Sequence, residues 1–188
     1  MSAYPQKQHL REQDYLKLEA LSEQKNEYVD GDCYAMAGAG EKHNRITLNI
    51  ALTLRQAARG SGCGVFASDM KCRIEQGRFY YYPDVMLVCE KADNAEYYKE
   101  QPCLIAEVQS PSTERIDRHE KWQSYSQIPS LKYYLLADSQ QKKVDYFQRD
   151  AAGNWQASLL ESEQALEITC GDYRATVSFD DIYEDVVF

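Results

Sequence analysis

The chain has 188 residues, of which 44% are apolar, as expected for a single globular domain over residues 1–188 rather than a disordered protein. The mean hydropathy is −0.64 and no apolar run reaches the roughly 18 residues of a membrane span, which argues against a membrane protein. The N-terminal segment lacks the apolar core of a secretory signal, so we expect a cytoplasmic protein with no membrane partner. The formal net charge of −9 disfavours tight non-specific binding to nucleic acid, although an acidic protein can still have a basic groove.

The six cysteines do not form a recognisable metal site. No pair is spaced Cys-x-x-Cys, and no histidine lies at a zinc-like spacing from a pair. Several fall inside apolar or alternating runs, so we expect reduced, buried thiols. The cysteines are Cys33, Cys63, Cys72, Cys89, Cys103 and Cys170.

The first part of the chain predicts two helices on either side of a hairpin. Apolar side chains near one face favour a peripheral helix over residues 9–21. Asp30-Gly31 is a strong turn signal between alternating runs, which predicts a hairpin over 27–36. Residues 42–59 carry apolar side chains at helical spacing and stop at Gly60, so they form the clearest helix.

The remainder of the chain predicts short strands and one further long helix. The expected strands cover 65–67, 70–74, 79–82, 84–89, 102–109, 132–137, 144–147 and 155–160. The first two of these can form one bent strand. The polar segment 91–101 is expected to be a surface loop or a short helical insertion. Ser112 or Thr113 can cap a helix that runs to about Gln127, and the segment around 177–183 has the pattern of a short capped helix. This order predicts an α/β (or α+β) fold with a mixed central β-sheet flanked by helices and a C-terminal antiparallel meander.

Two of the expected strands carry an acid among apolar residues, namely Asp84 and Glu107. Charged side chains are rarely buried unless they are paired or bind a metal. The simplest explanation is a hard divalent cation, Mg²⁺ or in its place Mn²⁺, held between the two carboxylates. Gln109 points the same way as Glu107, because side chains two residues apart share one face of a strand. The alternative is that Asp84 simply follows Pro83 in a turn at the start of its strand.

A set of short segments spread over about residues 10–150 carries a family resemblance. The segments are Glu27-Tyr28-Val29-Asp30-Gly31, His43-Asn44, Ser68-Asp69-Met70, Tyr82-Pro83-Asp84-Val85, Glu107-Val108, Ser110-Pro111-Ser112-Thr113, Asp117-Arg118, Glu120-Lys121 and Ile128-Pro129-Ser130-Leu131. Together they resemble the bacterial Uma-type family of restriction endonucleases. The order of the acids, strands and helices also resembles the restriction-endonuclease-like core of PD-(D/E)XK nucleases.

The resemblance implies a metal-dependent endonuclease that hydrolyses phosphodiester bonds of DNA. Asp84 and Glu107 would bind the metal, with the carbonyl of Val108 as a further ligand. The lysine of the motif is expected at position 109, where this chain has Gln109, and the family resemblance moves it to the following helix, here Lys121. A homodimer is also expected, because PD-(D/E)XK enzymes often act as dimers.

Glu27, His43 and Asp69 match other positions of the family and form a second tier of candidates near the cleft. Each also has a plainer interpretation: Glu27 as a solvated acid at a strand edge, His43 as a helix-start residue, and Asp69 as a turn residue. Lys121 likewise can form an i,i+4 pair with Asp117 on a solvated helix face.

Two other hypotheses stay open. The chain can be a nuclease fold that has lost catalysis and binds nucleic acid or a protein partner, because Gln109 cannot carry positive charge. It can also be an oligomeric interaction domain with no nucleic-acid role. A shared cleft for Asp84, Glu107 and the Lys121 ammonium would favour the nuclease, whereas acids on opposite sides of the sheet would exclude it.

Overall fold

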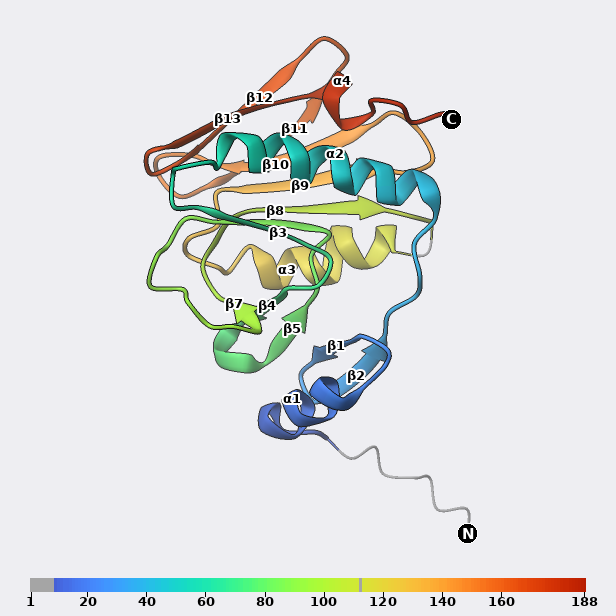
Figure 1. The fold of residues 1–188 in the computed structure, drawn as a ribbon, viewed down its shortest axis with the longest axis vertical. Helices are drawn as coiled ribbons and strands as arrows, with labels where there is room; N and C mark the ends of the chain where they lie inside the picture. The colour runs from blue at the N-terminus through green and yellow to red at the C-terminus, as the bar shows by residue number, and fades with distance from the viewer. Residues whose placement is uncertain (1–8, 112) are drawn as a thin grey trace.

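A computed structural model describes residues 9–111 and 113–188 and is built around a six-stranded sheet (Figure 1). The strand order is β11-β10-β9-β8-β6-β3, and neighbours are antiparallel except for the parallel pair β8 and β9. The strands are β3 (Gly64–Ala67), β6 (Val85–Val88), β8 (Pro102–Gln109), β9 (Tyr133–Asp138), β10 (Val144–Arg149) and β11 (Trp155–Leu160). The prediction of a mixed central sheet that continues into an antiparallel meander is therefore confirmed.

One face of this sheet is covered by α2 (Glu41–Ala57), on which the C-terminal hairpin of β12 (Ala165–Cys170) and β13 (Tyr173–Ser178) packs (Figure 1). A short helix, α4 (Phe179–Ile182), follows the hairpin. The helix α2 forms where the apolar spacing predicted it, because the stripe at helical period is buried in the core between the sheet and the hairpin.

The opposite face of the sheet is covered by a π-helix, η2 (Ile116–Lys121), that runs directly into α3 (Trp122–Tyr125). Tyr125 and the strand residue Ile105 are completely buried in the core between these layers. Because side chains alternate along a strand, Glu107 points to the same side as Ile105, toward this helix.

The N-terminal segments form a second, five-stranded sheet in the order β2-β1-β5-β4-β7. Its elements, with the helices beside it, are α1 (Glu12–Leu21), β1 (Asn26–Val29), β2 (Asp32–Ala35), β4 (Lys71–Ile74), the 3-10 turn η1 (Glu75–Gly77), β5 (Phe79–Tyr81) and β7 (Tyr98–Lys99). The predicted hairpin turn is present, and its φ values of 46° at Asp30 and 93° at Gly31 are typical of a type I′ turn. The peripheral helix α1 buries Tyr15 against Tyr28 and Tyr80.

Four local expectations differ from the structure. Segments 65–67 and 70–74 lie in different sheets, because the chain turns at Ser68, where φ is 57°. Segment 91–101 contains the strand β7 and no helix. The helix after Thr113 is π-helical through Lys121, and the alternative cap Ser112 lies outside the described residues. The hairpin of β12 and β13 was not predicted, and it includes residues 177–178, which were expected in the terminal helix.

The expectation of reduced thiols is wrong for four of the six cysteines. Disulfides join Cys63 to Cys89 and Cys103 to Cys170. The first joins the start of β3 to the end of β6, and the second joins β8 to β12. Sequence separations of 26 and 67 residues gave no indication of these pairs, because the sheet and the hairpin bring them together. Cys72 is free and buried, as expected, whereas Cys33 is free but exposed.

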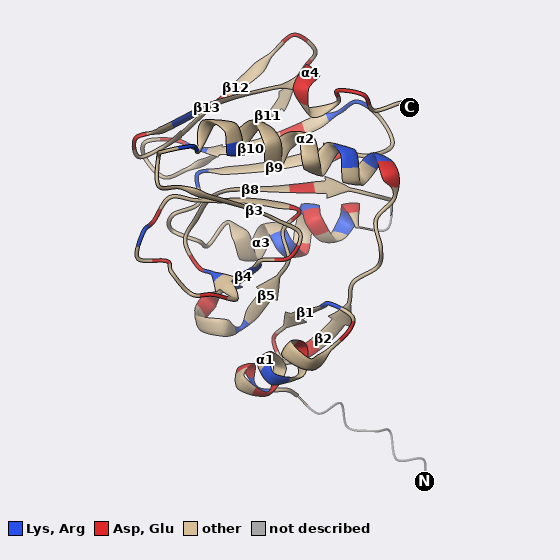
Figure 2. Ribbon diagram, in the orientation of Figure 1, with Lys and Arg blue, Asp and Glu red and all other residues tan. Residues whose placement is uncertain are grey.

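Acidic and basic positions are interspersed along the elements (Figure 2). Within residues 9–111 and 113–188, no helix is long and apolar enough to cross a membrane. The fully buried strand β8 has one charged residue, Glu107, whose side chain lies toward the helical layer with 2% of the residue exposed. A carboxylate in this position needs partners, and they define the site.

Candidate functional site

The two strand acids lie side by side. Met86 pairs with Ile105 in the antiparallel ladder of β6 and β8, so continuing the register puts Asp84 opposite Glu107. The Asp84 backbone N–H donates to Glu107 Oε2 over 3.3 Å, and Asp84 Oδ2 accepts from the Val108 N–H over 2.7 Å. Asp84 lies in the bend between Pro83 and β6, as the alternative interpretation expected, and its carboxylate is also held by a hydrogen bond from the neighbouring strand β8.

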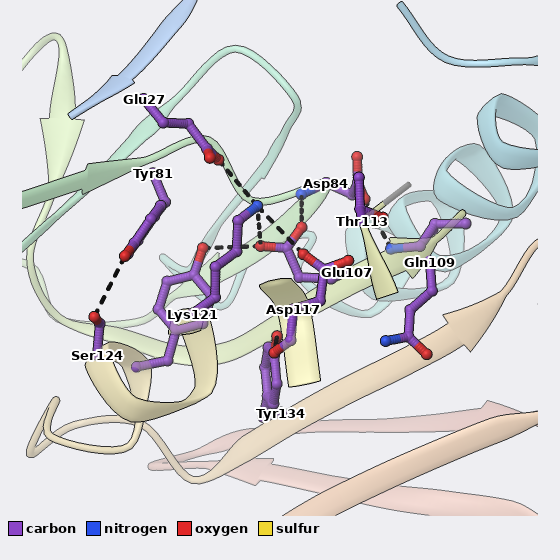
Figure 3. Close-up of polar contacts among 12 residues, drawn as sticks. Glu27, Tyr81, Asp84, Glu107, Gln109, Thr113, Asp117, Lys121, Ser124 and Tyr134 are labelled. Atoms are coloured by element: carbon purple, nitrogen blue, oxygen red, sulfur yellow. Dashed lines mark hydrogen bonds and ion pairs between the residues drawn. The ribbon is translucent and has the colours of Figure 1, made fainter. Parts of the chain in front are cut away.

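Lys121 reaches Glu107 from the π-helix on the same face (Figure 3). Its Nζ lies 3.2 Å from Glu107 Oε1, 2.9 Å from Glu27 Oε1 and 3.5 Å from Asp117 Oδ1. Lys121 is 7% exposed and Asp117 is 2% exposed, so the alternative of a solvated i,i+4 pair is wrong. Asp84, Glu107 and Lys121 thus belong to one cluster. Lys121 reaches it from a π-helical segment, and such segments often occur at functional sites.

The cluster contains more acidic than basic side chains. Burial by itself lowers the pKa of Lys121, but the carboxylates of Glu107, Glu27 and Asp117 raise that pKa well above its usual range. Burial raises the pKa of Glu107 well above its usual range and raises the pKa of Asp117, while Lys121 opposes both shifts. Three carboxyl groups share one ammonium, so repulsion among the acids adds to burial in raising the pKa of Glu107 and that of Asp117.

Two residues of the cluster were not among the predicted site residues. They are Asp117, which the i,i+4 spacing suggested as a surface partner of Lys121, and Tyr125. The Tyr125 hydroxyl donates to Glu107 Oε1 over 2.8 Å, which leaves Oε2 facing Asp84. The sequence signal for them is their spacing: Asp117 lies four residues before Lys121 and Tyr125 four residues after it. Residues at this spacing share one helix face, so both are expected beside Lys121.

Gln109 lies on the Glu107 side of β8, but its amide faces away from the Lys121 ammonium (Figure 3). Its Oε1 accepts from Arg118 Nη2 over 2.8 Å, and its Nε2 donates to the Glu114 carbonyl over 3.4 Å. Arg118 also pairs with Asp145 on β10. The residue at the position of the motif lysine therefore ties the helical segment to the sheet.

The three second-tier residues separate into two that contact the cluster and one that does not. Glu27, on β1, forms the ion pair with Lys121. His43 Nε2, on the first turn of α2, lies 3.2 Å from Asp84 Oδ2. Burial lowers the pKa of His43, but the hydrogen bond and charge of Asp84 outweigh it and raise the pKa overall. Asp69 is exposed and pairs with Lys25 at the margin of the site.

The side chains that could hold a metal are few. Among the described residues, 9–111 and 113–188, no group of three or more His, Cys, Asp or Glu is arranged to hold an ion. The protein would therefore offer the two carboxylates of Asp84 and Glu107. That number suits Mg²⁺, which usually keeps several waters and takes its remaining ligands from substrate phosphate.

Comparison with known proteins gives relatives over most of the chain. Residues 12–171 match the Uma2 family, described as "Putative restriction endonuclease". Two uncharacterized proteins of Synechocystis are similar: slr1290 is 32% identical over 160 residues (85% of this chain and 84% of that protein), and sll1609 is 34% identical over 155 residues (81% and 88%).

A crystal structure of "a putative nuclease belonging to DUF820" from Anabaena variabilis has the same fold. Its TM-score is 0.74 at 14% sequence identity, with 95% of this chain and 99% of that chain covered. The shared fold agrees with the restriction-endonuclease-like architecture expected from the sequence. Because the family match spans residues 12–171 and both Synechocystis relatives exceed 30% identity over most of the chain, this protein belongs to the Uma2 family of restriction-endonuclease-like proteins.

Proposed function

We propose that this protein is a metal-dependent endonuclease that hydrolyses phosphodiester bonds of DNA. The observation that carries the proposal is that Asp84, at the start of β6, lies beside Glu107 on the adjacent strand β8, and that the buried Lys121 ammonium contacts Glu107. Membership of a family described as "Putative restriction endonuclease" and the fold shared with "a putative nuclease" support the same reaction class.

The donor atoms fit a hard divalent cation, Mg²⁺ or in its place Mn²⁺. Asp84 and Glu107 would hold it through carboxylate oxygens, with the Val108 carbonyl as a further ligand. The raised pKa of Glu107 supports this assignment, because a carboxylate that burial makes costly to ionise gains most from a bound cation. When bound, the metal would supply a Lewis acid for a phosphoryl oxygen and would lower the pKa of a water.

Lys121 would orient the attacking water or neutralise the charge that develops on the phosphoryl oxygens. Its raised pKa keeps it protonated at neutral pH, so it serves as a cation and hydrogen-bond donor and does not take the proton of the water. Glu27 and Asp117 would hold the ammonium in place. Gln109 would act at a distance from the substrate, by holding Arg118.

The test is plasmid cleavage by purified protein with Mg²⁺ or Mn²⁺, beside the isosteric variants Asp84→Asn and Glu107→Gln and the variant Lys121→Met. Asp172→Asn, at an exposed position in the turn between β12 and β13, is the matched control. We expect cleavage by the wild type and the control, and a loss of at least about a hundredfold in the three site variants. Equal cleavage by all five proteins would show that the activity lies elsewhere or belongs to a contaminant.

One observation favours a second candidate function, a nuclease fold without catalysis that binds nucleic acid or a protein partner. Gln109 stands at the position of the motif lysine and is occupied by Arg118 and the Glu114 carbonyl. Salt-dependent DNA binding without metal-dependent cleavage would favour this candidate. Cleavage that Lys121→Met abolishes would exclude it. The expected homodimer stays a prediction that light scattering on the purified protein can test.

A further inference from the structure

A pair of lysines, Lys25 and Lys71, stands at the margin of the acidic cluster. Lys25 directly precedes β1 and lies two residues before Glu27, so in the extended chain the two side chains point to the same side. The Lys25 Nζ donates to the Ser68 carbonyl over 3.1 Å. The Ser68 N–H in turn donates to the Asp84 carbonyl over 3.1 Å. Lys25 is thus linked to two residues of the site: to Glu27 along the chain, and to the Asp84 backbone through hydrogen bonds of Ser68.

Lys71, the first residue of β4, reaches the same place. Its Nζ lies 3.4 Å from the Tyr82 hydroxyl and 5.2 Å from the centre of the Tyr82 ring. The Nζ of Lys25 lies 5.8 Å from the centre of the same ring. Both ammonium groups therefore gather around the side chain of Tyr82, which lies two residues before Asp84 in the chain and whose hydroxyl donates to Glu19 Oε1 over 2.7 Å.

The charges of these two lysines are only partly neutralised. Lys25 pairs with Asp69, whose side chain is 80% exposed, and within the described parts of the chain no carboxylate lies within ion-pair distance of Lys71. Burial lowers the pKa of Lys71, and the more distant Glu19 opposes this shift.

We propose that Lys25 and Lys71 form a binding site for backbone phosphates of the DNA strand that enters the cleft. The inference rests on the proposed function and adds to it the surface that would hold the substrate beside the metal-binding acids. The occupant follows from charge complementarity: of the two ammonium groups, only that of Lys25 forms a direct ion pair, with the exposed Asp69, so the pair can bind backbone phosphates of a nucleic acid. Tyr82 is 4% exposed, so it would position the lysines and would not stack on bases.

Fluorescence anisotropy with a labelled DNA duplex, in EDTA so that no strand is cut, tests the inference. The double variant Lys25→Gln/Lys71→Gln is compared with Lys91→Gln/Lys132→Gln. Both control lysines are exposed. Lys91 follows the end of β6 and Lys132 precedes the start of β9, so they lie at the opposite ends of these strands from Asp84 and Glu107. Both variants change the net charge equally, so steering by the overall charge cancels from the comparison.

We expect the first variant to bind at least about tenfold more weakly than the control at roughly 0.1 M salt, with a salt slope smaller by about 2. Lys25→Arg/Lys71→Arg should keep near wild-type affinity, and the same thermal midpoint in all variants would show that folding is intact. Equal affinity and slope in the two glutamine variants would overturn the inference while leaving the nuclease proposal standing. A wild type that neither binds nor cleaves DNA would overturn both.

Discussion

Replacing Lys121 by methionine is the most direct test of the buried cluster. The substitution keeps an unbranched side chain but removes the ammonium that lies 2.9 Å from Glu27, 3.2 Å from Glu107 and 3.5 Å from Asp117. Each attraction is worth roughly 5 kcal/mol in an effective dielectric of about 20, and desolvation cancels most of this. Removal of one partner from a buried ion pair typically costs about 3–5 kcal/mol, because the remaining charges are left unpaired. We expect Lys121→Met to lower the free energy of unfolding by this amount.

Urea unfolding in EDTA at neutral pH, followed by circular dichroism, measures this loss. The matched control is Arg45→Met, which removes an exposed ion pair to Glu41 with the same separation of 2.9 Å and should cost less than about 1 kcal/mol. The pKa of Glu107 and that of Asp117 are raised, so these acids take up protons as the pH falls, and the cost of Lys121→Met should shrink at acidic pH. A cost no greater than that of the control, or one that does not change with pH, would refute the description of Lys121 as the counter-ion of buried carboxylates.

Three further outcomes are expected. Gln109→Lys, which restores the motif lysine, should destabilise the protein by about 1–3 kcal/mol in urea unfolding and should not increase cleavage, because the new ammonium would lie beside a guanidinium; a more active and equally stable variant would contradict this. Replacing Cys103 and Cys170 together by serine should lower the free energy of unfolding by about 4 kcal/mol, since their disulfide closes a loop of 67 residues. An unchanged thermal midpoint would show that the disulfide does not form. Asp84 raises the pKa of His43, so the ion pair of the two residues stabilises the folded protein fully below about pH 6.5. This stabilisation is lost as the pH rises through the raised pKa of His43. In EDTA, wild type should therefore exceed His43→Gln in stability more at mildly acidic than at alkaline pH, and a pH-independent difference would contradict the pairing.

The sequence by itself determined the elements of the core. The apolar stripe of α2, the Asp30-Gly31 turn and the strand at 102–109 were readable because each depends on neighbours a few residues away. The acids Asp84 and Glu107 were conspicuous for the same reason, since each interrupts an apolar run. The family resemblance added Lys121, Glu27 and His43 as candidates, a choice that local pattern could not make.

Tertiary structure alone decided how these side chains meet. The i,i+4 spacing of Asp117 and Lys121 is the same on a solvated helix and on a buried one, and only the packing of η2 against β8 removes the pair from water. The contact of Tyr125 with Glu107, the turn of Gln109 toward Arg118 and the two disulfides likewise join segments distant in sequence. Hydrogen bonds and ion pairs of this kind depend on distances across the sheet, which a one-dimensional pattern does not contain.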